Sequence, residues 1–200
     1  MGLIILLVIV VVLGFVLVGI FNSITSLENR VVNALSQIDV QLKKRGDLVP
    51  NLVNTVKGYA AHEKDVLTQV TEARSRVGSI QATPALVNDQ EAMDKFIQAQ
   101  RSMTGALSRL MVVAENYPNI KADASFRDLQ AQLEGTENRI TVARNRYIES
   151  IRNFNVTVRS FPSNLTAKVV GLKVKANFAV EDEKSISTAP TVDFNASPKP

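Results

Sequence analysis

The sequence predicts an all-α protein: an N-terminal transmembrane helix, a four-helix bundle of up-and-down type, a short strand-like segment and a flexible tail. Three observations predict this class. An uninterrupted apolar segment stands at the N-terminus. Apolar residues then recur at alternating steps of three and four, and Gly and Pro divide the chain into pieces of helical length. We place these parts at residues 1–21, 22–165, 166–182 and 183–200.

The N-terminal segment is apolar at every position from Leu3 to Phe21. A helix of this length spans roughly 28 Å, close to the hydrocarbon thickness of a bilayer. The alternative is a cleaved signal peptide, which would have a basic start, a shorter apolar stretch and a small-residue cleavage site. We therefore expect a retained, single-pass membrane anchor. Arg30, the first basic residue after the span, favours a cytoplasmic location for the bundle.

The remaining helices follow from the apolar stripes and the helix-end signals. A stripe from Ile24 to Leu42 predicts that the first helix continues out of the membrane. Gly46, Asp47 and Pro50 then predict a break, either a kink or a hairpin. Further stripes predict helices over residues 52–80, 93–117 and 126–161, with a loop at 81–85 and Pro118 and Pro162 as helix stops.

The C-terminal part of the sequence changes its pattern. Leu172, Val174, Ala176 and Phe178 alternate with polar residues, which predicts one short strand. Because a lone strand needs a partner, we expect this segment either to pack as irregular structure on the bundle or to pair with another subunit. The residues from 183 onward are rich in Ser, Thr, Ala, Pro and Asn, which predicts a flexible tail.

The composition argues against several kinds of chemistry. The chain has no Cys, so it has no disulfide, thiolate nucleophile or Cys-ligated zinc. His62 is the only His, which excludes a His-based zinc site or a Ser-His triad within one subunit. The net charge of +4 comes without a basic run interleaved with aromatic residues, so we expect no nucleic-acid partner. We predict no catalytic, cofactor-binding or metal-binding residue.

Four polar residues interrupt the apolar stripes: Glu63, Gln100, Glu137 and Arg144. A buried charge is costly unless it is paired and hydrogen-bonded. One hypothesis is therefore a polar network between helices that fixes their register, with Glu63 facing Arg144. The alternative is that the stripe drifts and leaves these side chains at the rim of the core.

The densest basic cluster is Lys43, Lys44 and Arg45. If the first helix is continuous, the cluster lies roughly 33 Å beyond the end of the span. That distance is several Debye lengths, so we expect a solvated helix terminus rather than a contact with lipid headgroups.

Eight short motifs carry a resemblance that extends from Asn22 to Phe178. They are Gln37–Arg45, Asp47–Leu52, Tyr59–Glu63, Ala73–Arg74, Glu115–Pro118, Thr136–Ile140, Ala143–Tyr147 and Phe161–Asn164. Taken together, they resemble the LemA family of bacterial membrane proteins. The sequence departs from the family pattern at Leu35, where Trp is usual, at Ile148, where Asn is frequent, and at 170–172, where Phe-Gly-Phe is common.

The resemblance implies an N-terminal anchor and a bundle of long helices. It also implies that the protein is associated with envelope stress and with a neighbouring membrane metalloprotease. It also singles out motif residues as candidates for a polar core or an interface. These are Arg45, Asp47, Pro50, His62, Glu63, Arg74, Glu115, Tyr117, Pro118, Glu137, Asn138 and Arg144.

The leading functional hypothesis is a non-enzymatic, membrane-anchored scaffold or interaction protein that self-associates through its long helices. One alternative is an adaptor for a membrane protease, which would co-purify with the protease rather than with itself. Another is a carboxylate-based hydrolase, which would need a cleft with converging acids and shifted pKa values.

Overall fold

The computed structural model describes residues 1–178, and the described chain is all-α. Its elements are α1 (Gly2–Tyr59), α2 (Lys64–Gly78), the short 3-10 helix η1 (Pro84–Asn88), α3 (Gln90–Glu115), α4 (Pro118–Ala122), α5 (Ala124–Arg159) and α6 (Ser163–Val170). No strand occurs within residues 1–178. The predicted fold class is therefore confirmed, including the apolar N-terminal helix.

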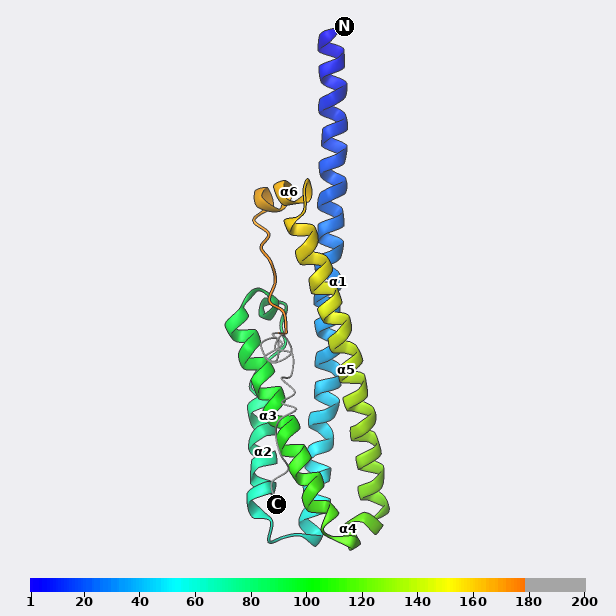
Figure 1. The fold of residues 1–200 in the computed structure, drawn as a ribbon, viewed down its shortest axis with the longest axis vertical. Helices are drawn as coiled ribbons and strands as arrows, with labels where there is room; N and C mark the ends of the chain where they lie inside the picture. The colour runs from blue at the N-terminus through cyan, green and yellow to red at the C-terminus, as the bar shows by residue number, and fades with distance from the viewer. Residues whose placement is uncertain (179–200) are drawn as a thin grey trace, which may run out of the picture.

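Helix α1 is the spine of the molecule (Figure 1). Its N-terminal part projects alone, and its remainder runs the full length of the bundle. Helix α5 packs along α1, while α2 and α3 form a second pair on the other side. Helix α4 and the neighbouring turns close the far end, and α6 packs on α1 and α5 at the end nearest the projecting helix.

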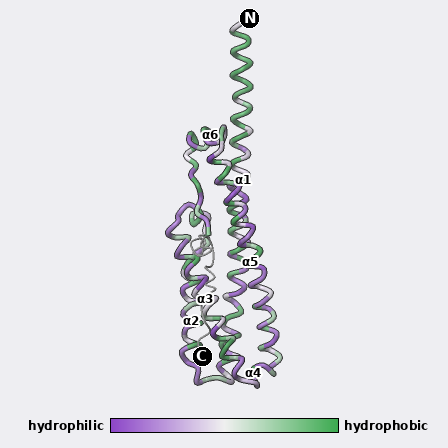
Figure 2. Tube along the Cα trace, in the orientation of Figure 1, coloured by the Kyte–Doolittle hydropathy of each residue, from purple (hydrophilic) through white to green (hydrophobic). Residues whose placement is uncertain are grey.

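The projecting part of α1 has no cover within residues 1–178. Its large apolar side chains are exposed, from Leu3 at 80% to Val16 at 48%. Figure 2 shows that this part of the helix is hydrophobic, whereas hydrophobic and hydrophilic residues alternate along the helices of the bundle. By length and composition it is the one helix of the described chain suited to crossing a membrane.

Of the two alternatives predicted at Gly46–Pro50, the hairpin is wrong, because α1 continues through Pro50 to Tyr59. Proline has no N–H, so Pro50 cannot donate to the carbonyl of Gly46 as a helical residue normally would. That carbonyl instead accepts a hydrogen bond of 2.9 Å from Nε of Arg74 on α2. The chain reverses later, at residues 60–63, so residues 52–59 belong to α1 and not to the second helix.

Two hydrophobic cores follow one another along the bundle. The proximal core lies at the end nearest the projecting helix. It joins residues 24–42 of α1 to η1, the start of α3, the second half of α5, α6 and residues 172–178, which we call the C-terminal segment. The distal core joins residues 49–60 to α2, the rest of α3, α4 and the first part of α5. The predicted stripes on α3 and α5 therefore both pack inward, and each stripe is divided between the two cores.

Beyond α6, residues 172–178 run back along the bundle without regular structure. Helix α6 extends to Val170, past the predicted boundary at 165, and Gly171 reverses the chain with a φ of 76°. The expected alternation is partly wrong, because Lys175 is buried and Val174 is 47% exposed. Residues 179–182 of the predicted segment and the tail at 183–200 lie outside the described residues.

Lys175 is buried because its ammonium group finds partners. Its Nζ donates to Oε1 of Glu28 at 2.7 Å and to Oδ1 of Asn88 at 2.9 Å, and it lies 4.9 Å from the ring centroid of Phe154. The Asn155 amide bonds both backbone groups of Lys175, accepting at 2.8 Å and donating at 3.2 Å. The C-terminal segment is thus fastened to α1, η1 and α5.

The substitution Pro50→Ala tests the account of the unbroken helix. It restores an N–H that can donate to the Gly46 carbonyl, so Arg74 should matter less in this background. We expect Arg74→Ala to lower the free energy of unfolding by about 0.5–1 kcal/mol in the natural sequence and by less in Pro50→Ala. A double-mutant cycle by thermal unfolding in detergent measures this coupling. Equal effects in both backgrounds would contradict it.

Candidate functional site

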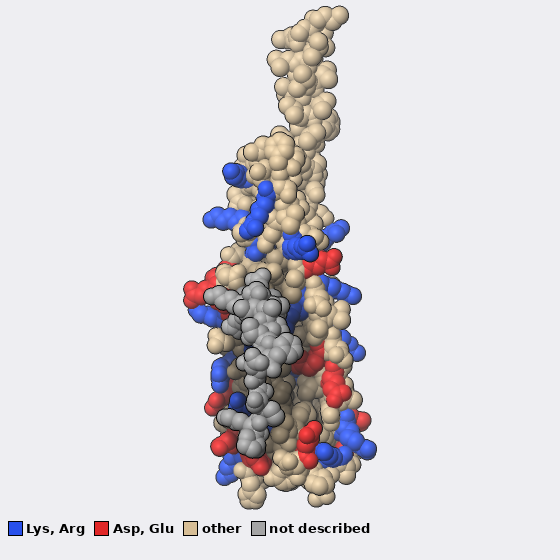
Figure 3. Space-filling model, in the orientation of Figure 1, with Lys and Arg blue, Asp and Glu red and all other residues tan. Residues whose placement is uncertain are grey.

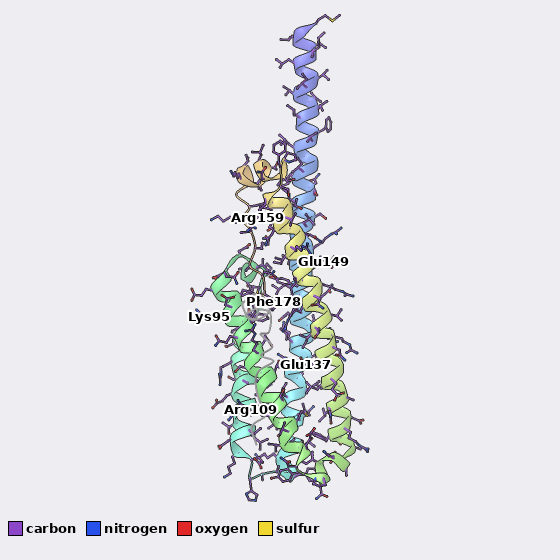
Figure 4. All side chains as sticks on the ribbon, viewed as in Figure 1. Lys95, Arg109, Glu137, Glu149, Arg159 and Phe178 are labelled. Carbon is purple, nitrogen blue, oxygen red and sulfur yellow. The ribbon has the colours of Figure 1, made fainter. Side chains whose placement is uncertain are left out.

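A buried arginine lies at the centre of the bundle. The Arg45 side chain is 3% exposed. Its Nη1 donates to Oε1 of Glu137 at 2.9 Å and to Oγ1 of Thr104 at 3.0 Å, and its Nη2 donates to Oε1 of Gln100. The guanidinium therefore links α1, α3 and α5. We call Arg45, Gln100, Thr104 and Glu137 the Arg45 layer; Figure 4 labels Glu137 within it.

The Arg45 layer separates the two hydrophobic cores. On α1, Leu42 belongs to the proximal core and Val49 to the distal core. Gln100 and Glu137 mark the same boundary on α3 and α5. Because a planar guanidinium needs its acceptors at defined positions, a slip of one helix along another would leave a buried charge without partners. The layer thereby opposes changes in helix register.

The predicted polar network is thus present with a different cation. Gln100 and Glu137 take part, as the stripes indicated, but Arg45 is the donor and is not the solvated helix terminus that we expected. Glu63 accepts from the Tyr117 hydroxyl at 3.1 Å instead of facing Arg144. The sequence could have predicted the burial of Arg45, because Arg45 continues the apolar stripe from Leu42 by a step of three.

Arg144 lies outside the Arg45 layer but close to it. Its guanidinium carbon is 5.3 Å from the centroid of the Phe178 ring, which in turn packs edge-on against Tyr147. Partial burial and the positive charge of Arg45 lower the pKa of Arg144. Burial raises the pKa of the Tyr147 hydroxyl, which donates to the backbone oxygen of Ala176. These contacts hold the end of the C-terminal segment on α5.

Two tyrosine–carboxylate hydrogen bonds tie the distal turns together. The Tyr59 hydroxyl donates to Asp123 at 2.8 Å, and Asp123 also caps α5 by accepting from the N–H of Phe126. These two donors lower the pKa of Asp123, and the carboxylate raises the pKa of Tyr59. The equivalent bond from Tyr117 to Glu63 raises the pKa of Tyr117. This end of the bundle is a structural closure.

The other predicted site residues are scattered. His62, Glu115 and Pro118 are exposed at the distal end, and Pro118 begins α4. Asp47 and Asn138 are exposed along the bundle. Within residues 1–178, no group of three or more His, Asp or Glu side chains is placed to hold a metal ion.

Among the hollows on the bundle surface, two lie beside residues already described. A cleft of about 570 Å³ opens beside the Arg45 layer between α1 and the α2–α3 pair, with Asp39, Lys43, Asp47 and Arg74 among its lining residues. The α1–α5 groove, of about 620 Å³, is lined by Ser36, Gln37, Val40, Gln41, Asn138, Arg139, Val142, Ala143 and Arg146.

The α1–α5 groove combines apolar surface with an unused acceptor. Val40 and Val142 are 49% and 50% exposed. Oε1 of Gln41 is buried but has no hydrogen-bond partner within residues 1–178. The two half-exposed valines give this groove an apolar patch that is open to solvent.

These features define a class of helical-bundle proteins in which an apolar N-terminal helix continues as the spine of the bundle. The chain belongs to the LemA family, whose profile matches residues 34–194. The family resemblance seen in the sequence motifs is therefore confirmed.

The sequence is also similar, at low identity, to three further proteins. Magnetosome protein MamQ of Magnetospirillum gryphiswaldense is 22% identical over 171 residues, and Magnetosome protein MamQ 2 of Paramagnetospirillum magneticum is 23% identical over 169 residues; each match covers 76% of this chain and 62% of the relative. Protein LemA of Metamycoplasma hominis is 24% identical over 168 residues, with 84% and 73% covered. The chain thus spans about three-fifths of the length of the MamQ relatives.

Substituting Arg45 tests the energetic role of the Arg45 layer. Arg45→Ala removes the donor for Gln100 and Glu137, and we expect it to lower the free energy of unfolding by about 2–3 kcal/mol, because Glu137 is partly solvated. Arg144→Met is the matched control, since it removes a guanidinium outside the layer, and we expect a loss below about 1 kcal/mol. Thermal and denaturant unfolding measure both. Similar losses for the two variants would contradict this role.

Proposed function

We propose that this LemA-family protein is a non-enzymatic, single-pass membrane protein of the bacterial envelope that acts as a self-associating scaffold. The observation that carries the proposal is the continuity of α1 from Gly2 to Tyr59. Its apolar part suits a bilayer, and its remainder is the spine against which the bundle packs. Because no flexible linker separates the two, the bundle stands on the membrane as a rigid rod. Residues 22–59 would extend it roughly 55 Å from the surface.

The interior polar chemistry supports a structural role. The buried charges within residues 1–178, Arg45 and Lys175, both bond to neighbouring helices and segments. The tyrosine–carboxylate bonds likewise tie turns to helices. Neither "Magnetosome protein" nor "Protein LemA", the names of the relatives, states a reaction.

The α1–α5 groove is the surface that we propose for self-association. Copies anchored in one membrane share their orientation, so a two-fold axis along the membrane normal would bring two identical grooves face to face. Val40 and Val142 would then lose their exposure.

The mass of the detergent-solubilised, full-length protein tests self-association. We expect a mass above that of the 21.9 kDa monomer after correction for bound detergent. Val142→Arg places a charge in the proposed contact, and we expect it to reduce the mass. Val112→Arg is the matched control, because Val112 is 60% exposed on α3, and it should leave the mass unchanged.

A monomeric natural protein would overturn self-association. If that monomer carried a stoichiometric membrane protease, the adaptor role would replace the scaffold. The cleft beside the Arg45 layer, with charged side chains of both signs at its edge, is the surface that favours this second candidate.

We further propose that the bundle lies in the cytoplasm. Arg30 is the basic residue that follows the apolar segment most closely, and basic residues beside a span favour the cytoplasmic side. The natural chain has no Cys, so single cysteines report location directly. We expect Ser108→Cys to react with a membrane-impermeant maleimide only after permeabilisation, and Gly2→Cys to react in intact spheroplasts. The opposite pattern would reverse the orientation.

A further inference from the structure

Helix α6 presents an apolar face to solvent. Leu165 is 53% exposed and Val169 is 88% exposed, and Phe161, in the turn before the helix, is 79% exposed. We call these three residues the α6 face. The opposite side of α6 is packed, since Thr166 and Ala167 are buried. An amphipathic surface helix normally turns its polar side outward, whereas α6 exposes large apolar side chains that need a partner.

The position of α6 indicates what that partner is. Helix α6 packs on α1 at the end of the bundle from which the apolar helix projects (Figure 1). Ile20, near the end of the apolar segment, packs against the proximal core, which includes Ala167 of α6. A bilayer that contains the projecting part of α1 would therefore have its surface at the level of α6.

The charges around α6 suit an anionic surface. Arg159, Lys168 and Lys173 are exposed, and residues 159–173 contain no Asp or Glu. In Figure 3 the charged side chains nearest the projecting helix are basic, and acidic side chains begin further down the bundle. Figure 4 places Arg159 at this end of α5, next to α6. Basic side chains that flank an apolar face are typical of helices that lie in the headgroup region of a membrane.

We propose that the α6 face is a second membrane contact, which lies in the headgroup region of an anionic bilayer beside the point where α1 leaves it. Phe161, Leu165 and Val169 enter the boundary of the acyl chains, and the flanking Lys and Arg side chains pair with lipid phosphates. This inference rests on the proposed anchoring by α1.

The second contact would have a mechanical consequence. A single spanning helix leaves a rigid bundle free to rotate about the helix axis and to tilt. With α6 also held at the surface, the tilt of the bundle is limited, and the α1–α5 groove stays upright on the membrane, facing sideways toward other copies.

Single tryptophans test the proposal, because the natural chain contains none. Val169→Trp reports on the α6 face, Phe15→Trp on the anchor and Val112→Trp on an exposed site far from α6. The full-length variants are placed in bilayers of phosphatidylethanolamine and phosphatidylglycerol with brominated acyl chains. We expect the bromine to quench Val169→Trp and Phe15→Trp, and to leave Val112→Trp unquenched but open to iodide. Since Val169 and Val112 are both exposed, neither change should disturb folding.

The outcomes separate the inference from the proposed function. If Phe15→Trp is quenched and Val169→Trp is not, the anchor stands and the α6 contact is overturned. If neither is quenched, the anchoring role itself fails. If Val169→Trp is protected from iodide but not quenched by bromine, another protein surface covers α6, which also overturns the lipid contact. In phosphatidylcholine alone we expect weaker quenching of Val169→Trp with Phe15→Trp unchanged; equal quenching would overturn the preference for anionic lipid.

Discussion

The structure depends on the burial of one guanidinium. Arg45 sits between two hydrophobic cores, with acceptors from α3 and α5 at 2.9–3.0 Å or closer. A bundle held only by apolar stripes tolerates sliding of its helices, because one aliphatic contact replaces another at little cost. A buried cation does not tolerate it, since displaced acceptors leave a charge without compensation. The Arg45 layer thus gives the long helices a defined alignment that hydrophobic packing alone would not specify.

The continuity of helix α1 and the helix register fixed by the Arg45 layer depend on each other. Pro50 lies one turn beyond Arg45 and removes one hydrogen bond from α1, which Arg74 of α2 replaces from outside. The helix thereby stays continuous from the apolar segment to the distal turns. As a result, Arg45 occupies a fixed position along the length of the bundle. Without the contact from α2, the sequence around Gly46 has the local character of a helix end.

The parts of the fold that follow from local pattern could be predicted from the sequence. The apolar segment, the stripes of α3 and α5 and the stops at Pro118 and Pro162 depend on residues close in the chain. The continuity of α1 could not be predicted, because the donor for the Gly46 carbonyl is 28 residues away. The same holds for Arg45 and Lys175, whose charged groups form hydrogen bonds to side chains 55 to 147 residues distant. For the candidate site, the pattern identified Gln100 and Glu137 but not the cation that joins them.

Because the C-terminal segment is part of the proximal core, the two cores can form only in a certain order during translation. Every buried residue of the distal core lies between positions 49 and 133, so the sequence needed for that half is complete before residues 134–200 are made. The proximal core needs residues from Ile24 to Phe178. The hydrogen bond from Lys175 to Glu28 cannot form until Lys175 has been synthesised. The N-terminal apolar helix leaves the ribosome first, yet the bundle end beside it is the last that can close. During translation, therefore, the end of the bundle farthest from the apolar helix can assemble while the end next to it is still open.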